Sequence, residues 1–107
     1  MAELSDNTLA LELPHIEIAR FCDRFGVASF ALFGSVLRQD FGADSDVDVL
    51  LTFKAGRGFT FENTPEIDEE LRRIFRGRPV DVVEVDHIRN PLRRAAILEN
   101  HRVIYVA

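Results

Sequence analysis

Apolar positions along the chain follow two different spacings, one typical of helices and one typical of strands. Apolar side chains three to four residues apart predict a helix over 14–25, and Gly26 is a suitable residue to end it. The continuous apolar run 27–33 predicts a buried strand. Ser35, just beyond that strand, is the expected N-cap of a short helical turn.

The rest of the chain continues this alternation. The pattern predicts a strand over 46–53, and then a helix that opens at Thr64 and Pro65 and closes at Gly77. A strand over 79–85, a last helix within 88–100 that begins near Asn90 and Pro91, and a strand over 103–106 follow. Such an order is typical of an α/β or α+β fold with a small sheet. Residues 1–13 are interpreted as a loose, flexible leader, and 14–107 as one domain.

Composition narrows the class of protein. With 107 residues, 47% hydrophobic and 29% charged, the chain is expected to fold as one globular domain. Its single cysteine, Cys22, excludes a disulfide framework and a cysteine-based zinc site, and is expected to be a buried structural thiol. No apolar run approaches the roughly 18 residues that span a bilayer, and no signal peptide is visible, so a cytoplasmic location is expected.

The net charge of -5 argues against polynucleotide binding, which usually shows a basic excess. A basic cluster lies on and after the predicted helix that opens at Pro65. It is interpreted as a solvated helix face balanced by neighbouring acids, with a role in gripping phosphate or a partner as the alternative. Its members are Arg72, Arg73, Arg76 and Arg78. The three histidines are scattered, without the spacing of metal ligands, and are expected at the surface.

Asp46 and Asp48 open the second predicted strand. Side chains two residues apart on a strand share a face, so these carboxylates repel each other unless a cation lies between them. Oxygen ligands of this kind suit Mg²⁺. A solvated acidic strand edge is the alternative. A calcium loop is excluded, because Val49 and Ala55 stand where it needs glycine and glutamate.

Gly34 and Ser35 end the first predicted strand. A glycine there lets a phosphate approach the backbone closely, and the free N–H groups of the following turn, with a serine hydroxyl, form an anion site. A plain turn with a serine cap is the alternative interpretation.

Together these two segments are more specific. A strand ending in Gly34 and Ser35, a spacer of ten residues and then Asp46 and Asp48 resemble the signature of the DNA polymerase beta-type nucleotidyltransferases. The chain looks like the minimal nucleotidyltransferases, which are single domains of this size. The resemblance covers residues 16 to 105 and implies a small mixed sheet of three to four strands flanked by helices.

Further positions match that pattern. Arg38 and Ser45 stand where the family has an arginine and a serine, so the resemblance implies that they help bind the nucleotide; Gln39 departs from the glycine common there. The family's third carboxylate lies on a later strand, where Asp81 stands among valines. An acid in that setting needs a metal or other partner, unless the side chain lies at an edge facing water.

The resemblance also implies a reaction. Asp46, Asp48 and Asp81 would hold two Mg²⁺ ions, about 3.5–4 Å apart, and the turn at Gly34 and Ser35 would bind the β- and γ-phosphates of ATP. An acceptor hydroxyl would attack the α-phosphorus and release pyrophosphate, with Asp81 also able to act as general base.

Minimal nucleotidyltransferases of this kind are paired with a HEPN-domain ribonuclease toxin. The resemblance therefore implies an antitoxin that transfers AMP from ATP to a tyrosine of its toxin. Two alternatives stay open: a non-catalytic module that neutralises its partner by contact, and a nucleotidyltransferase that modifies RNA or a small molecule.

Overall fold

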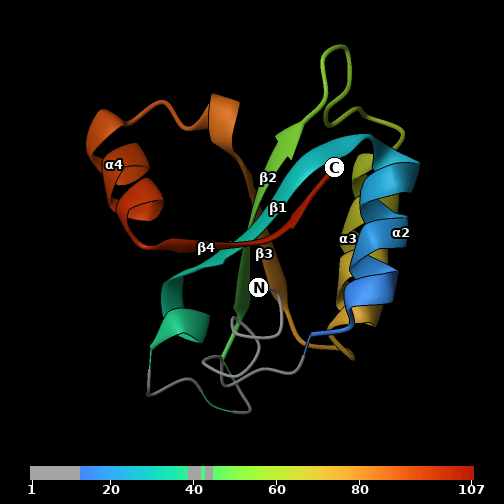
Figure 1. The fold of residues 1–107 in the computed structure, drawn as a ribbon, viewed down its shortest axis with the longest axis horizontal. Coiled ribbons are helices and arrows are strands. Elements are labelled where there is room, and N and C mark those ends of the chain that lie inside the picture. The colour runs from blue at the N-terminus through green and yellow to red at the C-terminus, as the bar shows by residue number, and fades with distance from the viewer. Residues whose placement is uncertain (1–12, 39–41, 43–44) are drawn as a thin grey trace.

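The structure is a computed structural model of the 107-residue chain, and it describes residues 13–38, 42 and 45–107 (Figure 1). Its centre is a four-stranded sheet, formed by β1 (Val27–Phe33), β2 (Val47–Phe53), β3 (Val80–Glu84) and β4 (His101–Val106). The strand order is β3-β2-β1-β4. Only β2 and β3 run parallel, while β1 pairs antiparallel with both β2 and β4. The mixed sheet predicted by the resemblance is therefore confirmed.

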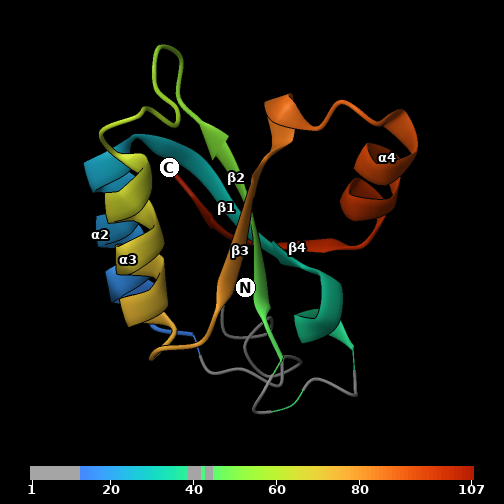
Figure 2. The same ribbon diagram turned by 180° about the vertical axis from the view of Figure 1, so that it is seen from behind.

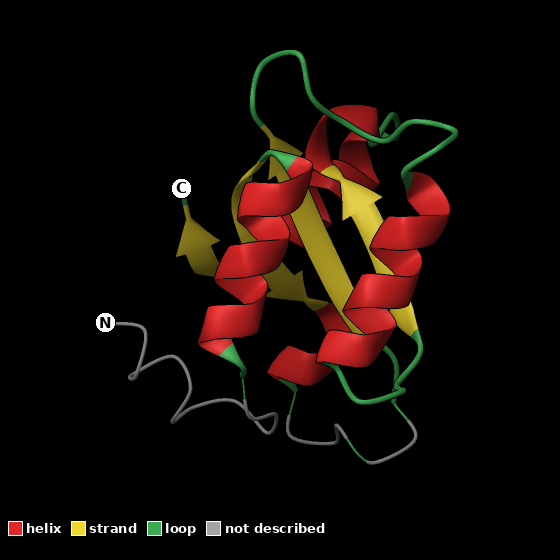
Figure 3. Ribbon diagram, turned by 90° about the vertical axis from the view of Figure 1, so that its right-hand side faces the viewer, coloured by secondary structure: helices red, strands yellow, loops and turns green. Residues whose placement is uncertain are grey.

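Two helices, α2 (His15–Phe25) and α3 (Thr64–Ile74), lie side by side over one face of the sheet (Figure 3). Alternate residues of the central strands point toward them and form the larger core, in which Phe30, Leu32 and Leu51 are fully buried. The ring of Phe21 on α2 meets that of Phe30 edge-on at 5.9 Å. This helical layer fixes which strand residues are left for the opposite face.

The opposite face carries a smaller apolar cluster, which includes Phe33, Leu50 and Ile97. Ile97 is the one residue of α4 (Pro91–Glu99) that is buried. Figure 2 shows α4 across the sheet from α2 and α3. On this face Leu50 and Phe33 are buried in the smaller cluster, while Asp48 is half-buried and Asp81 is exposed.

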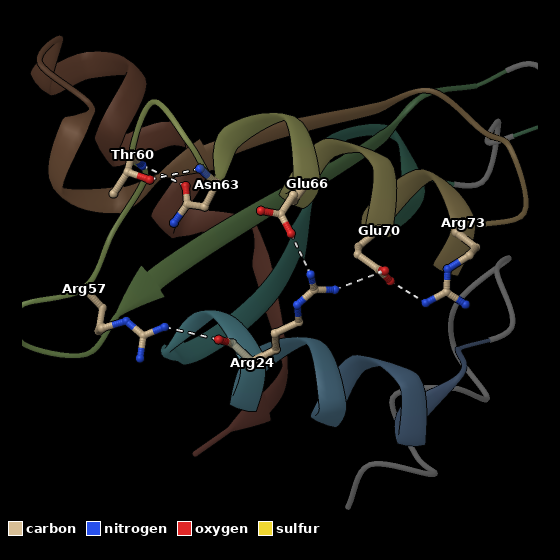
Figure 4. Close-up of polar contacts among 7 residues, drawn as sticks. All are labelled: Arg24, Arg57, Thr60, Asn63, Glu66, Glu70 and Arg73. Carbon is tan, nitrogen blue, oxygen red and sulfur yellow. Dashed lines mark hydrogen bonds and ion pairs between the residues drawn. The ribbon is translucent and has the colours of Figure 1, made fainter.

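Polar contacts tie α2 to α3 (Figure 4). The guanidinium of Arg24 pairs with Glu66 at 2.6 Å and with Glu70 at 3.3 Å, and Glu70 also pairs with Arg73. Arg57 donates to the carbonyl oxygen of Arg24 at 3.2 Å. Exposed pairs of this kind contribute little to stability, so the buried apolar face holds the helices in place.

The turn before α3 is closed by two side chains (Figure 4). The Thr60 N–H donates to Asn63 Oδ1 at 2.7 Å, and the Asn63 N–H donates to Thr60 Oγ1 at 2.9 Å. These two hydrogen bonds give partners to backbone N–H groups ahead of α3, where no preceding helical turn supplies carbonyl acceptors.

Most predicted elements are confirmed, with a few shifted ends. The last strand begins at His101 instead of Val103, and α3 ends at Ile74 instead of at Gly77. The last helix begins at Pro91, as expected from Asn90 and Pro91, because Val85–His87 forms a separate 3₁₀ turn, η2, and the side chain of Asn90 caps α4. The expected leader lies outside the described residues except for Leu13, which is buried.

Two residue-level expectations are also settled. Cys22 is buried, and burial raises the pKa of its thiol to about 12, as expected of a structural cysteine. Ser35 is not an N-cap: it lies inside the 3₁₀ turn η1 (Gly34–Leu37), and its hydroxyl donates instead to the Asp46 carbonyl oxygen at 3.2 Å. Within the part of the chain that the structure describes, no helix is long and apolar enough to cross a membrane.

Candidate active site

The turn after β1 brings the backbone against a carboxylate. Gly34 has a φ of 74°, a conformation that residues with a side chain rarely adopt. A Cβ built on Gly34 would lie 2.2 Å from Oδ2 of Asp48, so only glycine leaves room for this carboxylate. Phe33 pairs with Asp48 across the β1–β2 ladder, which explains the close approach. The backbone at Gly34 thus lies directly against Asp48, while the joint role of Gly34 and the Asp pair in binding a nucleotide stays a prediction.

Asp81 lies beside Asp48 on the neighbouring strand. The two residues are partners in the parallel ladder between β2 and β3, so their side chains share one face of the sheet. Because the flanking residues Val47, Val49 and Val82 pack into the core under α2 and α3, this face is the open one. The structure therefore brings together two acids that are 33 positions apart in the sequence.

Asp46 lies just ahead of β2, which begins at Val47. The sequence pattern placed it inside the strand. Hydrogen bonds to two neighbouring segments hold this part of the backbone. The Asp46 carbonyl accepts from the Ser35 hydroxyl, and the Val47 N–H donates to the Pro79 carbonyl at 3.0 Å. The Asp46 residue is exposed, whereas Asp48 is half-buried.

The pKa of Asp48 is raised above its ordinary value. Burial is the largest cause, and the neighbouring charges of Asp81 and Asp46 add to it. The Ser35 N–H, which donates to the carboxylate, and the charge of Arg38 act in the opposite direction. An ionised Asp48 is thus short of compensating positive charge.

This donor set fits a hard divalent cation. Asp46, Asp48 and Asp81 offer only carboxylate oxygens, and a cation between them would relieve the repulsion that raises the pKa of Asp48. Among the residues that the structure describes, no three acidic, histidine or cysteine side chains already converge as a finished metal cage. A cation would draw together carboxylates that otherwise stay apart.

The other two predicted binding residues lie along the same segment. Arg38 is exposed directly after η1, close enough for its charge to act on Asp48. Ser45 accepts at its hydroxyl oxygen from the Gly42 N–H and donates its own N–H to the Gly42 carbonyl, both at 3.1 Å. In this structure Ser45 closes a turn ahead of Asp46, and nucleotide binding by Ser45 stays a prediction. Gln39 lies outside the described residues.

Sequence reasoning missed Arg78. It was grouped with the arginines of a solvated helix face, yet its Nη1 donates to the carbonyl oxygens of Gly42 at 2.9 Å and Ser45 at 3.1 Å. The available signal was position: Arg78 follows Gly77, outside α3, and directly precedes the strand that carries Asp81.

Comparisons with known proteins agree with this geometry. The family model described as "Nucleotidyltransferase domain" matches residues 17–104. A protein of Methanocaldococcus jannaschii named "Putative protein adenylyltransferase" is 34% identical over 84 residues, which are 78% of this chain and 81% of the relative.

Solved structures share the fold. One, a "putative minimal nucleotidyltransferase", has a TM-score of 0.65 and 29% identity, over 81% of this chain and 85% of the other. A toxin–antitoxin structure with AMP-PNP has a TM-score of 0.68 and 15% identity, over 89% of this chain and 75% of the other. The toxin–antitoxin MntA-HpeT carrying two substitutions has a TM-score of 0.65 and 14% identity, over the same shares of the two chains.

The family match covers the turn at Gly34 and all three carboxylates, and the fold and the spacing of these residues agree with it. This chain belongs to the nucleotidyltransferase domain family and is a nucleotidyltransferase.

Proposed function

We propose that this chain transfers AMP from ATP to a tyrosine hydroxyl of a HEPN-domain ribonuclease toxin, and so acts in the cytoplasm as the antitoxin of that toxin. One observation carries the proposal: Asp48 and Asp81 face the same side of the sheet as ladder partners, with the Gly34 turn against Asp48. A nucleotide and an acceptor have to meet at this point.

The donor side of the site is the turn η1. Gly34 allows a phosphate to approach the backbone, and Arg38 adds a positive charge. The Ser35 N–H and hydroxyl, which here donate to Asp48 and to the Asp46 carbonyl, would turn to the phosphate when it binds. These groups suit the β- and γ-phosphates of ATP. Asp46, Asp48 and Asp81 would hold two Mg²⁺ ions, which supply positive charge to the phosphates and make a bound hydroxyl easier to deprotonate.

The acceptor side is the edge formed by β3. The tyrosine oxygen attacks the α-phosphorus, a new P–O bond forms, and the bond between the α-phosphorus and the bridging oxygen breaks. Pyrophosphate leaves with the electron pair of that bond, and Asp81 takes the proton of the hydroxyl. The exposed carboxylate of Asp81 is suited to this task because a bulky acceptor can reach it.

The proposal of a protein acceptor rests on two observations. The named relative is a "Putative protein adenylyltransferase", and two structures of the same fold come from toxin–antitoxin complexes. In addition, α4 turns its apolar side outward: Leu92 is 81% exposed, and Ala95 and Ala96 are exposed, while Ile97 alone is buried. We propose that the toxin covers this outward face of α4, which lies on the same side of the sheet as the carboxylates.

A labelling experiment tests the transfer. The purified chain, Mg²⁺ and the HEPN-domain protein encoded beside it would be incubated with ATP labelled at either the α- or the γ-phosphate. AMP transfer predicts label in the toxin from α-labelled ATP alone, and no label with Asp46→Asn or Asp48→Asn. Label from γ-labelled ATP, or transfer that survives both substitutions, would contradict the proposal. An unlabelled but stable complex would favour neutralisation by contact.

A further inference from the structure

Arg78 joins two parts of the site that are far apart in the sequence. Its guanidinium donates from Nη1 to the carbonyl oxygens of Gly42 and Ser45, 36 and 33 positions earlier. Gly42 and Ser45 also hydrogen-bond to each other, and Ser45 directly precedes Asp46. Arg78 itself lies next to Pro79 and β3, the strand that carries Asp81.

The backbone beside Arg78 reinforces this connection. The Pro79 carbonyl accepts from the Val47 N–H at 3.0 Å, between Asp46 and Asp48. The Arg78 N–H donates to the Phe75 carbonyl at 3.2 Å, which anchors the arginine to the end of α3. The backbone of Arg78 is therefore held in place. Arg78 and Pro79, the two residues ahead of β3, hydrogen-bond to Ser45 and Val47 on either side of Asp46.

Asp46 needs such support more than the other two acids. Asp48 and Asp81 are fixed by the β2–β3 ladder, but Asp46 precedes the strand, is exposed, and carries the same charge as its neighbours. Repulsion from Asp48 would push Asp46 outward unless another group held the backbone ahead of it. Two hydrogen bonds from the Arg78 guanidinium hold the carbonyls of Gly42 and Ser45, just ahead of Asp46.

We propose that Arg78 is a positioning residue of the nucleotidyl-transfer site: it holds the carbonyls of Gly42 and Ser45 so that the carboxylate of Asp46, the next residue, faces the same cation as Asp48 and Asp81. The inference rests on the proposed function for its catalytic consequence. Its structural consequence, an affinity for divalent cations that depends on Arg78, is measured without any acceptor.

The test is a titration of the whole chain with Mn²⁺, as a probe for Mg²⁺, followed by calorimetry or electron paramagnetic resonance. Arg78→Ala should weaken Mn²⁺ binding about tenfold, the size typical of residues that orient metal ligands. Arg78→Lys, which provides a single point donor, should restore part of that loss. Arg72→Ala is the matched control, because Arg72 is exposed in the same basic cluster, and it should bind Mn²⁺ as the unsubstituted chain does.

A double-mutant cycle separates positioning from a general effect on folding. In the Asp46→Asn background, Arg78→Ala should cause no further loss of Mn²⁺ affinity, since the ligand that Arg78 positions is already gone. A loss of equal size in both backgrounds, or no loss at all, would overturn the proposal. If Arg78→Ala does not fold, Arg78→Gln takes its place in the cycle with the same two criteria.

Kinetics with ATP distinguish positioning from direct phosphate binding by Arg78. Positioning predicts a lower kcat with little change in KM for ATP at saturating Mn²⁺, whereas direct binding predicts a raised KM and would overturn the proposal. Failure of AMP transfer by the unsubstituted chain would contradict the proposed function alone, because the Mn²⁺ titration and its cycle would still report on Arg78.

Discussion

The contact between Gly34 and Asp48 shows how one missing side chain shapes the site. Backbone with a φ near +74° costs a residue with a side chain about 1–2 kcal/mol. At Gly34 a side chain would in addition collide with the Asp48 carboxylate. Gly56 has a similar φ of 78°, but nothing lies within 4 Å of a Cβ built there. Substitutions at Gly34 and Gly56 therefore distinguish the cost of backbone strain, common to both, from displacement of the Asp48 carboxylate, which only Gly34 would cause.

Gly34→Ala should lower nucleotidyl transfer at least 100-fold, because the added methyl group displaces Asp48 from its place. Gly56→Ala should lower the free energy of unfolding by a similar amount through backbone strain, and its transfer rate should stay unchanged. Steady-state kinetics and urea unfolding of the two variants test this. Equal transfer rates in both variants would contradict the role given to the Gly34–Asp48 contact.

The raised pKa of Asp48 predicts how stability depends on pH when no divalent cation is bound. Burial and the charges of Asp81 and Asp46 raise this pKa in the folded chain, so ionised Asp48 favours the unfolded state. The destabilisation is present above the folded-state pKa and disappears as the pH falls below the unfolded value of about 3.9.

In EDTA at neutral pH, Asp48→Asn should therefore melt at a higher temperature than the unsubstituted chain, although it loses transfer. The gain should shrink as the pH approaches 4. Thermal melts across this pH range measure it, with Asp86→Asn, an exposed acid of η2, as the control. A variant that melts lower than the parent at every pH would show that the charge of Asp48 does not strain the fold.

At the scale of elements, α4 is held differently from the other helices. It buries only Ile97, so packing contributes little, and its first turn depends on Asn90. The Asn90 Oδ1 accepts from the N–H groups of Leu92 at 2.9 Å and Arg93 at 3.2 Å. A capping side chain of this kind stabilises a helix by about 1 kcal/mol.

Asn90→Ala should therefore increase amide hydrogen exchange in α4 about fivefold, the equivalent of that 1 kcal/mol, while α2 and α3 exchange as before. Asn100→Ala, at the other end of the helix, is the control and should change little. Exchange that increases in all three helices would mean that α4 unfolds only together with the core.

How much of the fold could be predicted differs from element to element. Apolar spacing located α2, β1 and α3 closely, because each buries a continuous face in the main core. The start of α4 was indicated by the residue types of Asn90 and Pro91 and not by apolar spacing, because burial there is slight and a side-chain cap sets the boundary. Apolar spacing does not locate a helix end that is fixed by one hydrogen-bonding side chain.

The candidate site divides in the same way. The spacing of Gly34, Asp46 and Asp48 pointed to these residues through the resemblance, and Asp81 followed only from the resemblance. For Arg78 the only signal in the sequence is its position between Gly77 and the strand of Asp81, because its hydrogen bonds go to carbonyl groups that no side-chain pattern records.

At the scale of the whole molecule, the sheet separates two layers with different tasks. The layer of α2 and α3 buries most of the core, and α4 lies on the opposite side of the sheet (Figure 1), the side that Asp48 and Asp81 share. Under the proposed function, a partner would bind α4 and present its hydroxyl to Asp81 without disturbing the core.

The most direct measurement is the intact mass of the HEPN-domain protein encoded beside this chain, after co-production with the unsubstituted chain and, separately, with its Asp46→Asn variant. The account predicts that the mass increases by one or more adenylyl groups with the unsubstituted chain and stays unmodified with Asp46→Asn, and that the modified residue is a tyrosine. An unmodified partner in both samples, or the same increase in both, would contradict it.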